Sequence, residues 1–196
     1  PPPRLRRQRQ MCIRDSGLAE TAYKNLIAEE DSSDQERQGA IYSLSQLSYI
    51  AEDYKTSIRY LLEWLDNEEE PSSDGYGLLA QAYYQVEDFQ KSVNAIDTAI
   101  EIQESRDIPI KVAVLDAEGN ETGEMIETGE TRKGVAKENH YLLKMALYSE
   151  LKKDLEVLPI YEILVQHYPK KRYWTNLSGL YGQKDRQMDQ MGALEA

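Results

Sequence analysis

The sequence predicts an all-α fold, a solenoid in which antiparallel helix pairs stack one on the next. One pattern of large and small residues recurs, starting at Ile41, Tyr76, Tyr141 and Trp174, which lie 35, 65 and 33 residues apart. Within each copy the large residues recur every three or four positions, as on one face of a helix. Helix-pair repeats have periods of about 34 to 47 residues, so the long interval indicates an insertion.

Residues 1–16 are expected to lie outside the fold. Residues 6–16 read Arg-Arg-Gln-Arg-Gln-Met-Cys-Ile-Arg-Asp-Ser, which matches a transposase-type sequencing adapter translated in frame. The rival interpretations are a basic nucleic-acid-binding arm and the start of a signal peptide, but a signal peptide needs an apolar stretch that does not follow. Because the chain also stops within a helical pattern, we expect it to be truncated at both ends.

Charge limits the class of partner. The whole chain carries −12, and residues 1–16 hold five arginines and one aspartate, so the remainder has 18 basic and 34 acidic residues and carries −16. Nucleic acids and anionic lipids bind through Lys and Arg, so we expect neither, and we expect a protein partner with basic residues. The only cysteine is Cys12, so no disulfide or thiolate metal site is predicted. No window approaches the roughly 18 apolar residues of a membrane span, so no direct membrane insertion is predicted.

Residues 17–103 are predicted to hold half a repeat and two complete repeats. The half repeat is one helix without its partner. The complete repeats follow at about 41–64 and 76–99, with turns at 53–54 and 87–89. A single helix pair cannot bury its apolar face alone, so the pairs are expected to stack into one continuous core.

Particular residue types are expected at the contacts between helices. Small residues, Ser45, Ala80 and later Ser178, stand where two helices must approach closely. The aromatic residues Tyr83 and Trp174 are expected to be buried, each contributing about 1.5–3 kcal/mol.

Residues 104–137 break the repeat. Residues 108–115 are rich in β-branched residues, 117–123 have turn composition, and 124–128 fit a returning strand. These features predict a β-hairpin at about 108–128 that projects from the solenoid. The alternative is a solvated loop, which residues 129–134 resemble.

The insertion also contains the spacing of a calcium-binding loop. Asp116, Glu118, Asn120, Glu124 and Glu127 fall at positions 1, 3, 5, 9 and 12 of such a loop. The required glycine at position 6 is replaced by glutamate, and no helices flank the segment, so the hairpin turn is favoured and no metal site is predicted.

Residues 138–196 are predicted to hold one complete and one truncated repeat. Together with residues 17–103 they resemble the tetratricopeptide repeat, through a first aromatic such as Tyr76, a small residue such as Ala80 and a second aromatic such as Tyr83. The alternative is an ordinary helical bundle with coincidental spacing. Three positions depart from the family pattern: Ser48, Lys144 and Gln190.

The resemblance implies that the first helix of each repeat lines a concave groove. The alternative role of these residues is packing between repeats. Tyr and Gln offer apolar area and hydrogen bonds, which suit an extended or helical protein segment. The groove positions of the family correspond to Tyr42, Gln46, Tyr49, Ile50, Gln81, Tyr84, Gln85, Leu142 and Ser149.

A narrower resemblance covers about 60 residues. Residues 137–143, 147–151, 167–174, 177–182 and 190–196 look like the tetratricopeptide proteins encoded beside TonB–ExbB–ExbD systems in Gram-negative bacteria. This resemblance implies a periplasmic accessory component of TonB-dependent uptake, with the cytoplasm as the alternative location.

No catalytic, cofactor-binding or metal-binding residue is predicted. His140 and His167 are the only histidines, have no metal-spaced partner, and are expected at the surface or at helix ends. Residues 170–172, Lys-Lys-Arg, either bind an acidic partner or simply precede a helix. The predicted function is a non-catalytic protein-interaction scaffold. The alternative is a repeat module of a larger protein with a catalytic or membrane domain, such as a protease or a cell-wall assembly factor.

Overall fold

The chain forms helices throughout its described residues, apart from one two-stranded sheet. Residues 1–16, expected to be adapter-derived, lie outside the described residues. The chain divides into two compact units, Pro1–Ile96 and Asp97–Ala196, here called the N-terminal and C-terminal units. The computed structural model describes residues 17–29, 31–68, 70, 72–115 and 121–194.

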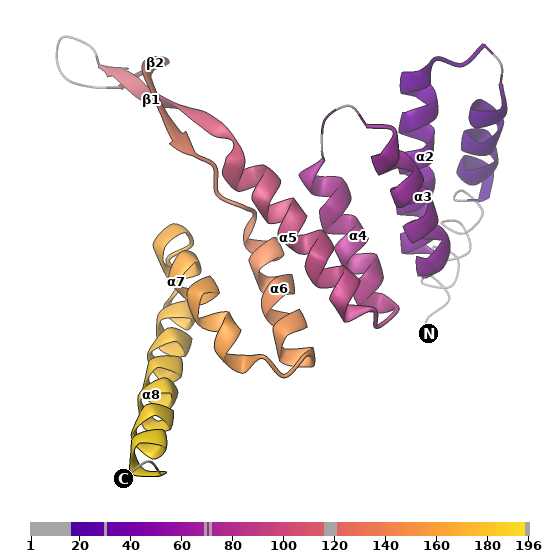
Figure 1. Ribbon diagram of the computed structural model, residues 1–196. Coiled ribbons are helices and arrows are strands. Elements are labelled where there is room, and N and C mark those ends of the chain that lie inside the picture. Colours follow the sequence, from indigo (N-terminus) through magenta and orange to yellow (C-terminus); the bar gives the residue numbers. More distant parts are fainter. Residues whose placement is uncertain (1–16, 30, 69, 71, 116–120, 195–196) are drawn as a thin grey trace, which may run out of the picture. The chain divides into compact units, whose positions relative to one another are not determined.

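The N-terminal unit consists of the predicted helix pairs (Figure 1). Residues 17–28 form a helix, which is followed by α2 (Asp34–Ile50), α3 (Tyr54–Asp66), α4 (Ser73–Gln85) and the first half of α5 (Phe89–Ser105). Helix α3 packs against both α2 and α4. The core includes Ile41, Leu44, Leu61, Trp64, Leu79, Ala80 and Ile96 of the repeated pattern, together with Ala40, Ala82, Val93 and Ala95.

Small residues allow the paired helices of this unit to approach closely, as predicted. Ser45 on α2 and Ala80 on α4 are fully buried, and so are Ser57 on α3 and Ser92 on α5. The Ser92 hydroxyl donates a 2.6 Å hydrogen bond to the Ala80 carbonyl oxygen. Because protein interiors are close-packed, a larger side chain at these contacts would push the two helices apart.

The C-terminal unit begins within α5 and contains both the hairpin and the later helices (Figure 1). The order is β1 (Asp107–Leu115), β2 (Glu121–Lys133), α6 (Glu138–Glu150), the short 3₁₀ helix η1 (Asp154–Val157), α7 (Leu158–His167) and α8 (Lys171–Leu194). Helix α7 packs against both α6 and α8. The core of the C-terminal unit consists of Ala99, Ile100, Ala136, Tyr141, Leu147, Leu158, Ile160, Leu164, Val165, Tyr173 and Leu177.

The turn that ends the first helix of a pair has the same backbone geometry three times. Glu52, Glu87 and Lys152 have positive φ angles of 64°, 61° and 56°. At each turn this residue and the next donate N–H groups to carbonyls three and five residues earlier, at 2.8–3.0 Å, which is the Schellman motif. The three residues lie 35 and 65 positions apart, so the backbone follows the register of the sequence pattern.

The start of the second helix differs between the units. Asp53 and Asp88 cap α3 and α5, because their carboxylates accept the N–H groups of Thr56 and Lys91 at 3.2 and 3.3 Å. In the C-terminal unit Lys153 stands at this place and makes no side-chain cap. There the chain passes through η1 before α7 begins.

The predicted β-hairpin is confirmed. Strands β1 and β2 are antiparallel, with Asp107 opposite Lys133 and Leu115 opposite Glu121. The prediction of a loop over 129–134 is wrong as far as Lys133, because two Thr-Gly-Glu segments absorb the extra residues of β2. Their glycines, Gly123 and Gly129, have φ angles of 84° and 81° and coincide with the register shifts of the sheet.

Four predictions of burial need correction. Ser178, expected at a close contact between two helices, is exposed on α8. Trp174 is 56 % exposed, because Tyr173 and Leu177 form the buried face of α8 and Trp174 lies off that face. Tyr83 is only half-buried, and the Lys91 ammonium lies over its ring, 5.5 Å from the centroid. His140, expected at the surface, is buried within the first turn of α6, whereas His167 is exposed as predicted.

Candidate functional site

Seven of the nine predicted groove residues lie on α2 and α4 of the N-terminal unit. The three tyrosines among them are half-buried, so part of each ring is committed to packing, and an alanine variant would lose packing as well as contact surface. The ring centroids are 4.4 Å apart for Tyr42 and Trp64, 5.3 Å for Tyr49 and Tyr54, and 5.7 Å for Tyr84 and Phe89.

Tyr49 also joins the inner faces of α2 and α4. Burial raises the pKa of its hydroxyl, and a hydrogen bond with the Gln85 side chain opposes that rise. Gln81, one turn before Gln85 on α4, is half-buried. The exposed residues of this face are Gln46, Gln85 and Ile50, and 76 % of Ile50 is exposed. This face therefore presents amide groups and one large apolar side chain to solvent.

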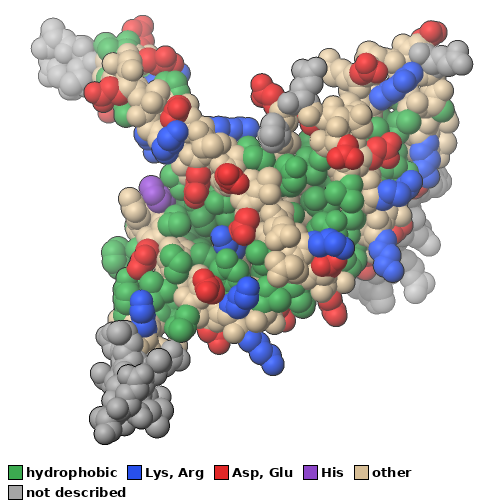
Figure 2. Space-filling model, in the orientation of Figure 1, with side chains coloured by type: hydrophobic (Ala, Val, Ile, Leu, Met, Phe, Trp, Pro, Cys, Tyr) green, Lys and Arg blue, Asp and Glu red, His purple; other side chains and the backbone are tan. Residues whose placement is uncertain are grey.

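The other two predicted residues, Leu142 and Ser149, line a pocket within the C-terminal unit. The pocket has a volume of about 750 Å³ and is bounded by α6, η1, α7 and α8. Hydrophobic side chains gather over α6 and α7 on the face shown in Figure 2, with charged side chains scattered among them. The remaining lining residues are Met145, Ala146, Asp154, Val157, Tyr161, Thr175, Asn176, Gly179, Leu180 and Gln183.

The lining combines an apolar floor with a hydrogen-bonding rim. Aliphatic side chains come from α6, η1 and α8, while the hydroxyl and amide groups include those of Ser149, Asn176 and Gln183. Asp154 is the only charged residue among the lining residues, and none of them is Lys or Arg. The pocket is therefore suited to an apolar side chain flanked by groups that donate hydrogen bonds.

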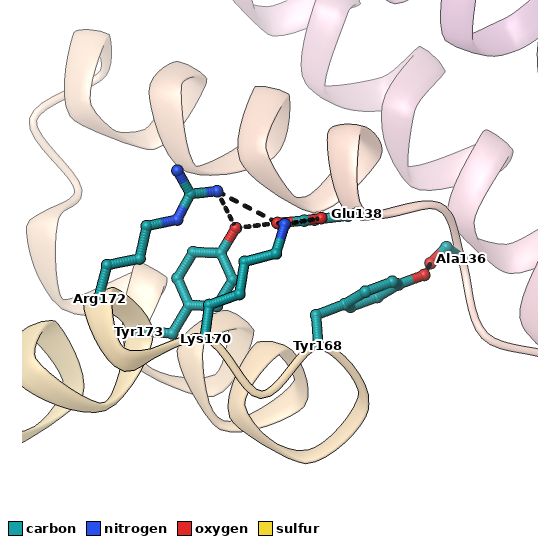
Figure 3. Close-up of polar contacts among 6 residues, drawn as sticks. All are labelled: Ala136, Glu138, Tyr168, Lys170, Arg172 and Tyr173. Carbon is teal, nitrogen blue, oxygen red and sulfur yellow. Dashed lines mark hydrogen bonds and ion pairs between the residues drawn. The ribbon is translucent and has the colours of Figure 1, made fainter.

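A cluster of polar side chains around Glu138 fixes the start of α6 against the start of α8 (Figure 3). The Glu138 carboxylate accepts hydrogen bonds from Lys170 Nζ at 2.6 Å, from Arg172 at 3.2 Å and from the Tyr173 hydroxyl. These contacts, with Lys170 the largest contributor and Tyr173 next, lower the pKa of Glu138. Two of the three basic residues at 170–172 thus hold α6 and α8 together, which sets the pocket's two walls.

The other side of α6 is fixed to the second half of α5. The Tyr141 hydroxyl donates to Glu104, and burial, followed by this contact, raises the pKa of Tyr141. Lys144 forms a 2.7 Å ion pair with Asp97; burial opposes its charge, but Asp97 outweighs that effect and raises the pKa of Lys144. Lys144, which departs from the repeat pattern, is thus held in place by its ion pair with Asp97.

The described part of the chain has neither a metal-binding cluster nor a membrane-spanning helix. No group of three or more His, Cys, Asp or Glu side chains is arranged to hold a metal ion there. Of the positions tested as a calcium loop, Glu124 and Glu127 lie on β2, while Asp116, Glu118 and Asn120 lie outside the described residues. None of the described helices is long and apolar enough to cross a membrane.

Comparison with known proteins identifies the fold. No protein-family model and no curated protein matches the chain. Among solved structures, MamA aligns with a TM-score of 0.60 at 14 % identity, covering 90 % of this chain and 83 % of MamA. The chain has the tetratricopeptide-repeat (TPR) fold.

Two further TPR structures align with this chain at a TM-score of 0.50. The first TPR domain of Spaghetti (RPAP3), bound to the HSP90 peptide SRMEEVD, is 12 % identical and covers 78 % of this chain and 99 % of its own. The TPR-like repeats of a Podospora anserina protein designated a kinesin light chain are 15 % identical to this chain. The alignment covers 98 % of this chain and 92 % of that protein's chain.

The TPR register also accounts for groove residues that the sequence analysis missed. The groove positions on α6 (142, 146, 149 and 150) recur 33 residues later on α8, at Thr175, Gly179, Gly182 and Gln183. Thr175, Gly179 and Gln183 line the pocket, whereas Gly182, the counterpart of Ser149, does not. Extending the register into the last helix therefore finds these three lining residues, but not Asn176 or Leu180. The lining residues of η1 and α7 stand at positions of the second helix of the repeat, and the resemblance assigned groove positions only to the first helix.

Proposed function

We propose that this TPR chain is a non-catalytic protein-interaction scaffold whose C-terminal unit binds an extended or helical protein segment in the pocket between α6 and α8. The supporting observation is the lining itself, an apolar floor of about 750 Å³ with amide and hydroxyl groups around it. Such surfaces bind a peptide through one apolar anchor and fix its direction with a few hydrogen bonds.

The charge of the pocket suggests the chemistry of the partner. The peptide in the RPAP3 structure, SRMEEVD, contains three acidic residues, whose carboxylates need basic groups. The pocket of this chain has no Lys or Arg in its lining and contains Asp154, and the whole chain is acidic. We therefore propose a partner segment that carries basic residues beside its apolar anchor.

Two peptides matched in length test this proposal. Fluorescence anisotropy on the full chain would compare SRMEEVD with its charge-reversed counterpart SRMKKVK, as probes rather than natural ligands. We expect the basic peptide to bind at least about tenfold more tightly, and its association rate to fall with added salt. Equal binding of both peptides, or tighter binding of SRMEEVD, would contradict the proposed partner.

A matched pair of glycine variants tests the location. A Cβ atom at Gly179 or Gly182 meets no heavy atom within 4 Å, so a side chain can start from either position without a backbone clash, but only Gly179 lines the pocket. Gly179→Phe should weaken peptide binding by at least about tenfold, and Gly182→Phe by less than about twofold. An equal effect of both variants would place the binding surface elsewhere.

The physiological setting that we propose follows the narrower resemblance over residues 137–196. It is an accessory role in a periplasmic TonB-dependent uptake system of a Gram-negative bacterium. Deleting the full-length gene should impair growth on an iron source that requires TonB and leave growth on free iron normal. Normal growth on both sources would remove the TonB assignment and leave the scaffold proposal intact.

A further inference from the structure

The N-terminal unit has a pocket of its own, here called the N-terminal pocket, between the first half of α2 and the end of α3. Its volume is about 720 Å³. Of the nine predicted groove residues only Tyr42 is among its lining residues, so it is not the face formed by Tyr49 and Gln85. The lining residues are Asp34, Gln35, Gln38, Gly39, Tyr42, Trp64, Asn67, Glu68 and Glu70.

An aromatic pair forms the floor of the N-terminal pocket. The ring centroids of Tyr42 and Trp64 are 4.4 Å apart, and the ring planes are tilted by 35°. Trp64 is almost wholly buried and Tyr42 is half-buried, so both rings are held in place. Gly75 of α4 leaves room for the indole, because a Cβ atom there would clash with Cζ3 of Trp64. The residue that matches Trp64 in the next repeat is Ala99, so this floor belongs to the first repeat.

The charge of the lining has one sign. Asp34 begins α2, Glu68 and Glu70 follow α3, and none of these three forms an ion pair among the described residues. No Lys or Arg is among the residues that line the pocket. Arg37, which lies nearby in sequence, instead donates a 2.9 Å hydrogen bond to the Glu29 carbonyl oxygen. The N-terminal pocket is therefore suited to a cation.

The chemistry of the lining selects an organic cation. Among the described residues no carboxylates are arranged to hold a metal ion. A cation is attracted to the face of Trp or Tyr, and a guanidinium group is planar, stacks on aromatic rings and carries several N–H donors. The side-chain oxygens of Gln35, Gln38 and Asn67 are acceptors for such donors. The ammonium of lysine is compact and strongly hydrated, so the lining favours arginine.

We propose that the N-terminal pocket binds an arginine side chain of a protein partner, with the guanidinium against the Tyr42–Trp64 pair and the carboxylates of Asp34 and Glu68 beside it. This site is additional to the pocket between α6 and α8, and each can fail its test without the other. Free arginine is a poorer ligand than an arginine within a peptide, because its α-carboxylate adds a negative charge beside the acidic lining.

The NMR signal of the Trp64 indole N–H in the full chain tests the proposal. In a Trp174→Phe background Trp64 is the only tryptophan, and Trp174 lines neither pocket. The probe acetyl-Ala-Arg-Ala-amide should shift this signal with a Kd below about 1 mM. The same peptide with citrulline, a neutral isostere of arginine, should bind at least about tenfold more weakly. No shift with the arginine peptide, equal binding of both peptides, or tighter binding of free L-arginine would overturn the proposal.

Two double variants with the same change of charge test the role of the lining. Asp34→Asn with Glu68→Gln removes two carboxylates of the pocket, whereas Glu63→Gln with Asp66→Asn removes two exposed carboxylates of α3 outside its lining. The first pair should weaken binding of the arginine peptide at least about fivefold and the second less than about twofold, because salt screens exposed charges at a distance. An equal effect would show that the overall acidity of the chain, and not this pocket, attracts the peptide.

Blocking the pocket without a change of charge tests its location. Gly39 lines the pocket, and a Cβ atom there meets no heavy atom within 4 Å, so the side chain of Gly39→Leu starts without a backbone clash. Leucine favours a helix more than glycine does, so circular dichroism should show undiminished helicity. Binding of the arginine peptide should weaken at least about fivefold. Unchanged binding by this folded variant would show that the peptide binds elsewhere.

Discussion

The second repeat of the N-terminal unit and the complete repeat of the C-terminal unit share their spacing but differ where their helices touch. In the repeat of the N-terminal unit, Ala80 and Ser92 are fully buried and bring α4 and α5 together. The residues 65 positions later are Met145 and Val157, which are half-buried and line the pocket. The repeat pattern is kept in its spacing, and the pocket forms where its small residues are replaced by larger ones.

The start of the second helix differs in the same way. Asp88 caps α5 directly, whereas Lys153 cannot cap, and the chain makes η1 before α7. Asp154 of η1, at the place of Phe89, faces the pocket instead of a core. The comparison indicates that the pocket of this chain's C-terminal unit arises where the packing residues of the repeat are replaced, while the spacing of the repeat is kept.

The largest expected change in the free energy of unfolding comes from placing methionine, the residue at position 145, at the corresponding position 80 of the N-terminal unit. Ala80→Met adds three heavy atoms at a fully buried contact and should lower the free energy of unfolding by about 3 kcal/mol, the upper part of the range for overpacking. The converse, Met145→Ala, removes a half-buried side chain at the pocket and should lower it by only about 1 kcal/mol.

Urea unfolding followed by tryptophan fluorescence measures this pair of variants. Trp64 lies in the core of the N-terminal unit and Trp174 in the C-terminal unit, and they are the only tryptophans. Trp174→Phe and Trp64→Phe backgrounds therefore report each unit separately. Equal losses for Ala80→Met and Met145→Ala would mean that the two contacts are equally tight.

The second prediction supplies the missing cap. Lys153→Asp places an aspartate after the third turn, as at Asp53 and Asp88, where aspartate caps the helix that follows. It should raise the free energy of unfolding by about 1 kcal/mol. For a chain of this size the thermal midpoint should rise by roughly 2–4 °C. Asp88→Lys makes the opposite exchange and should lower the midpoint. If Lys153→Asp is neutral, η1 is fixed by the residues around it and not by the absent cap.

The sequence predicted the fold well because spacing determines it. The starts at Ile41 and Tyr76 lie in α2 and α4, and the hairpin lies where the interval is long. Only Leu142 and Ser149 of the pocket lining were predicted as groove residues, because Asp154 and Val157 of η1 stand at positions of the second helix, which packs inside the other repeats. The prediction that Trp174 is buried was wrong, because the neighbouring Tyr173 enters the core instead. Periodicity gives the buried face of a helix only to within about one residue.

The third prediction concerns the cluster that fixes the pocket walls, which has no counterpart among the described residues of the N-terminal unit. The pKa of Glu138 is lowered in the folded chain, mainly by Lys170, so its contribution to stability is present above the unfolded pKa of 4.5. It is lost as the pH falls through the folded value, which lies below 4.5. Between pH 5 and pH 3 the urea midpoint of the C-terminal unit should therefore fall more steeply in the wild-type chain than in Glu138→Gln. Parallel pH profiles would show that the cluster does not bind Glu138 in its charged form.

The smallest expected effect tests what the two regions share. Glu52, Glu87 and Lys152 occupy the left-handed region, where a Cβ atom costs roughly 1–2 kcal/mol, while glycine loses about 0.5–1 kcal/mol of backbone freedom on folding. Replacing any of the three by glycine should therefore stabilise the chain by about 0.5 kcal/mol. Ala51→Gly is the matched control, because φ there is −77°, and it should be destabilising. Since all three turns have the same backbone, the three gains should agree in thermal unfolding, even though the helices that follow begin differently. A gain at Glu52 and Glu87 with a loss at Lys152 would show that the relaxed packing of the third repeat extends into its turn.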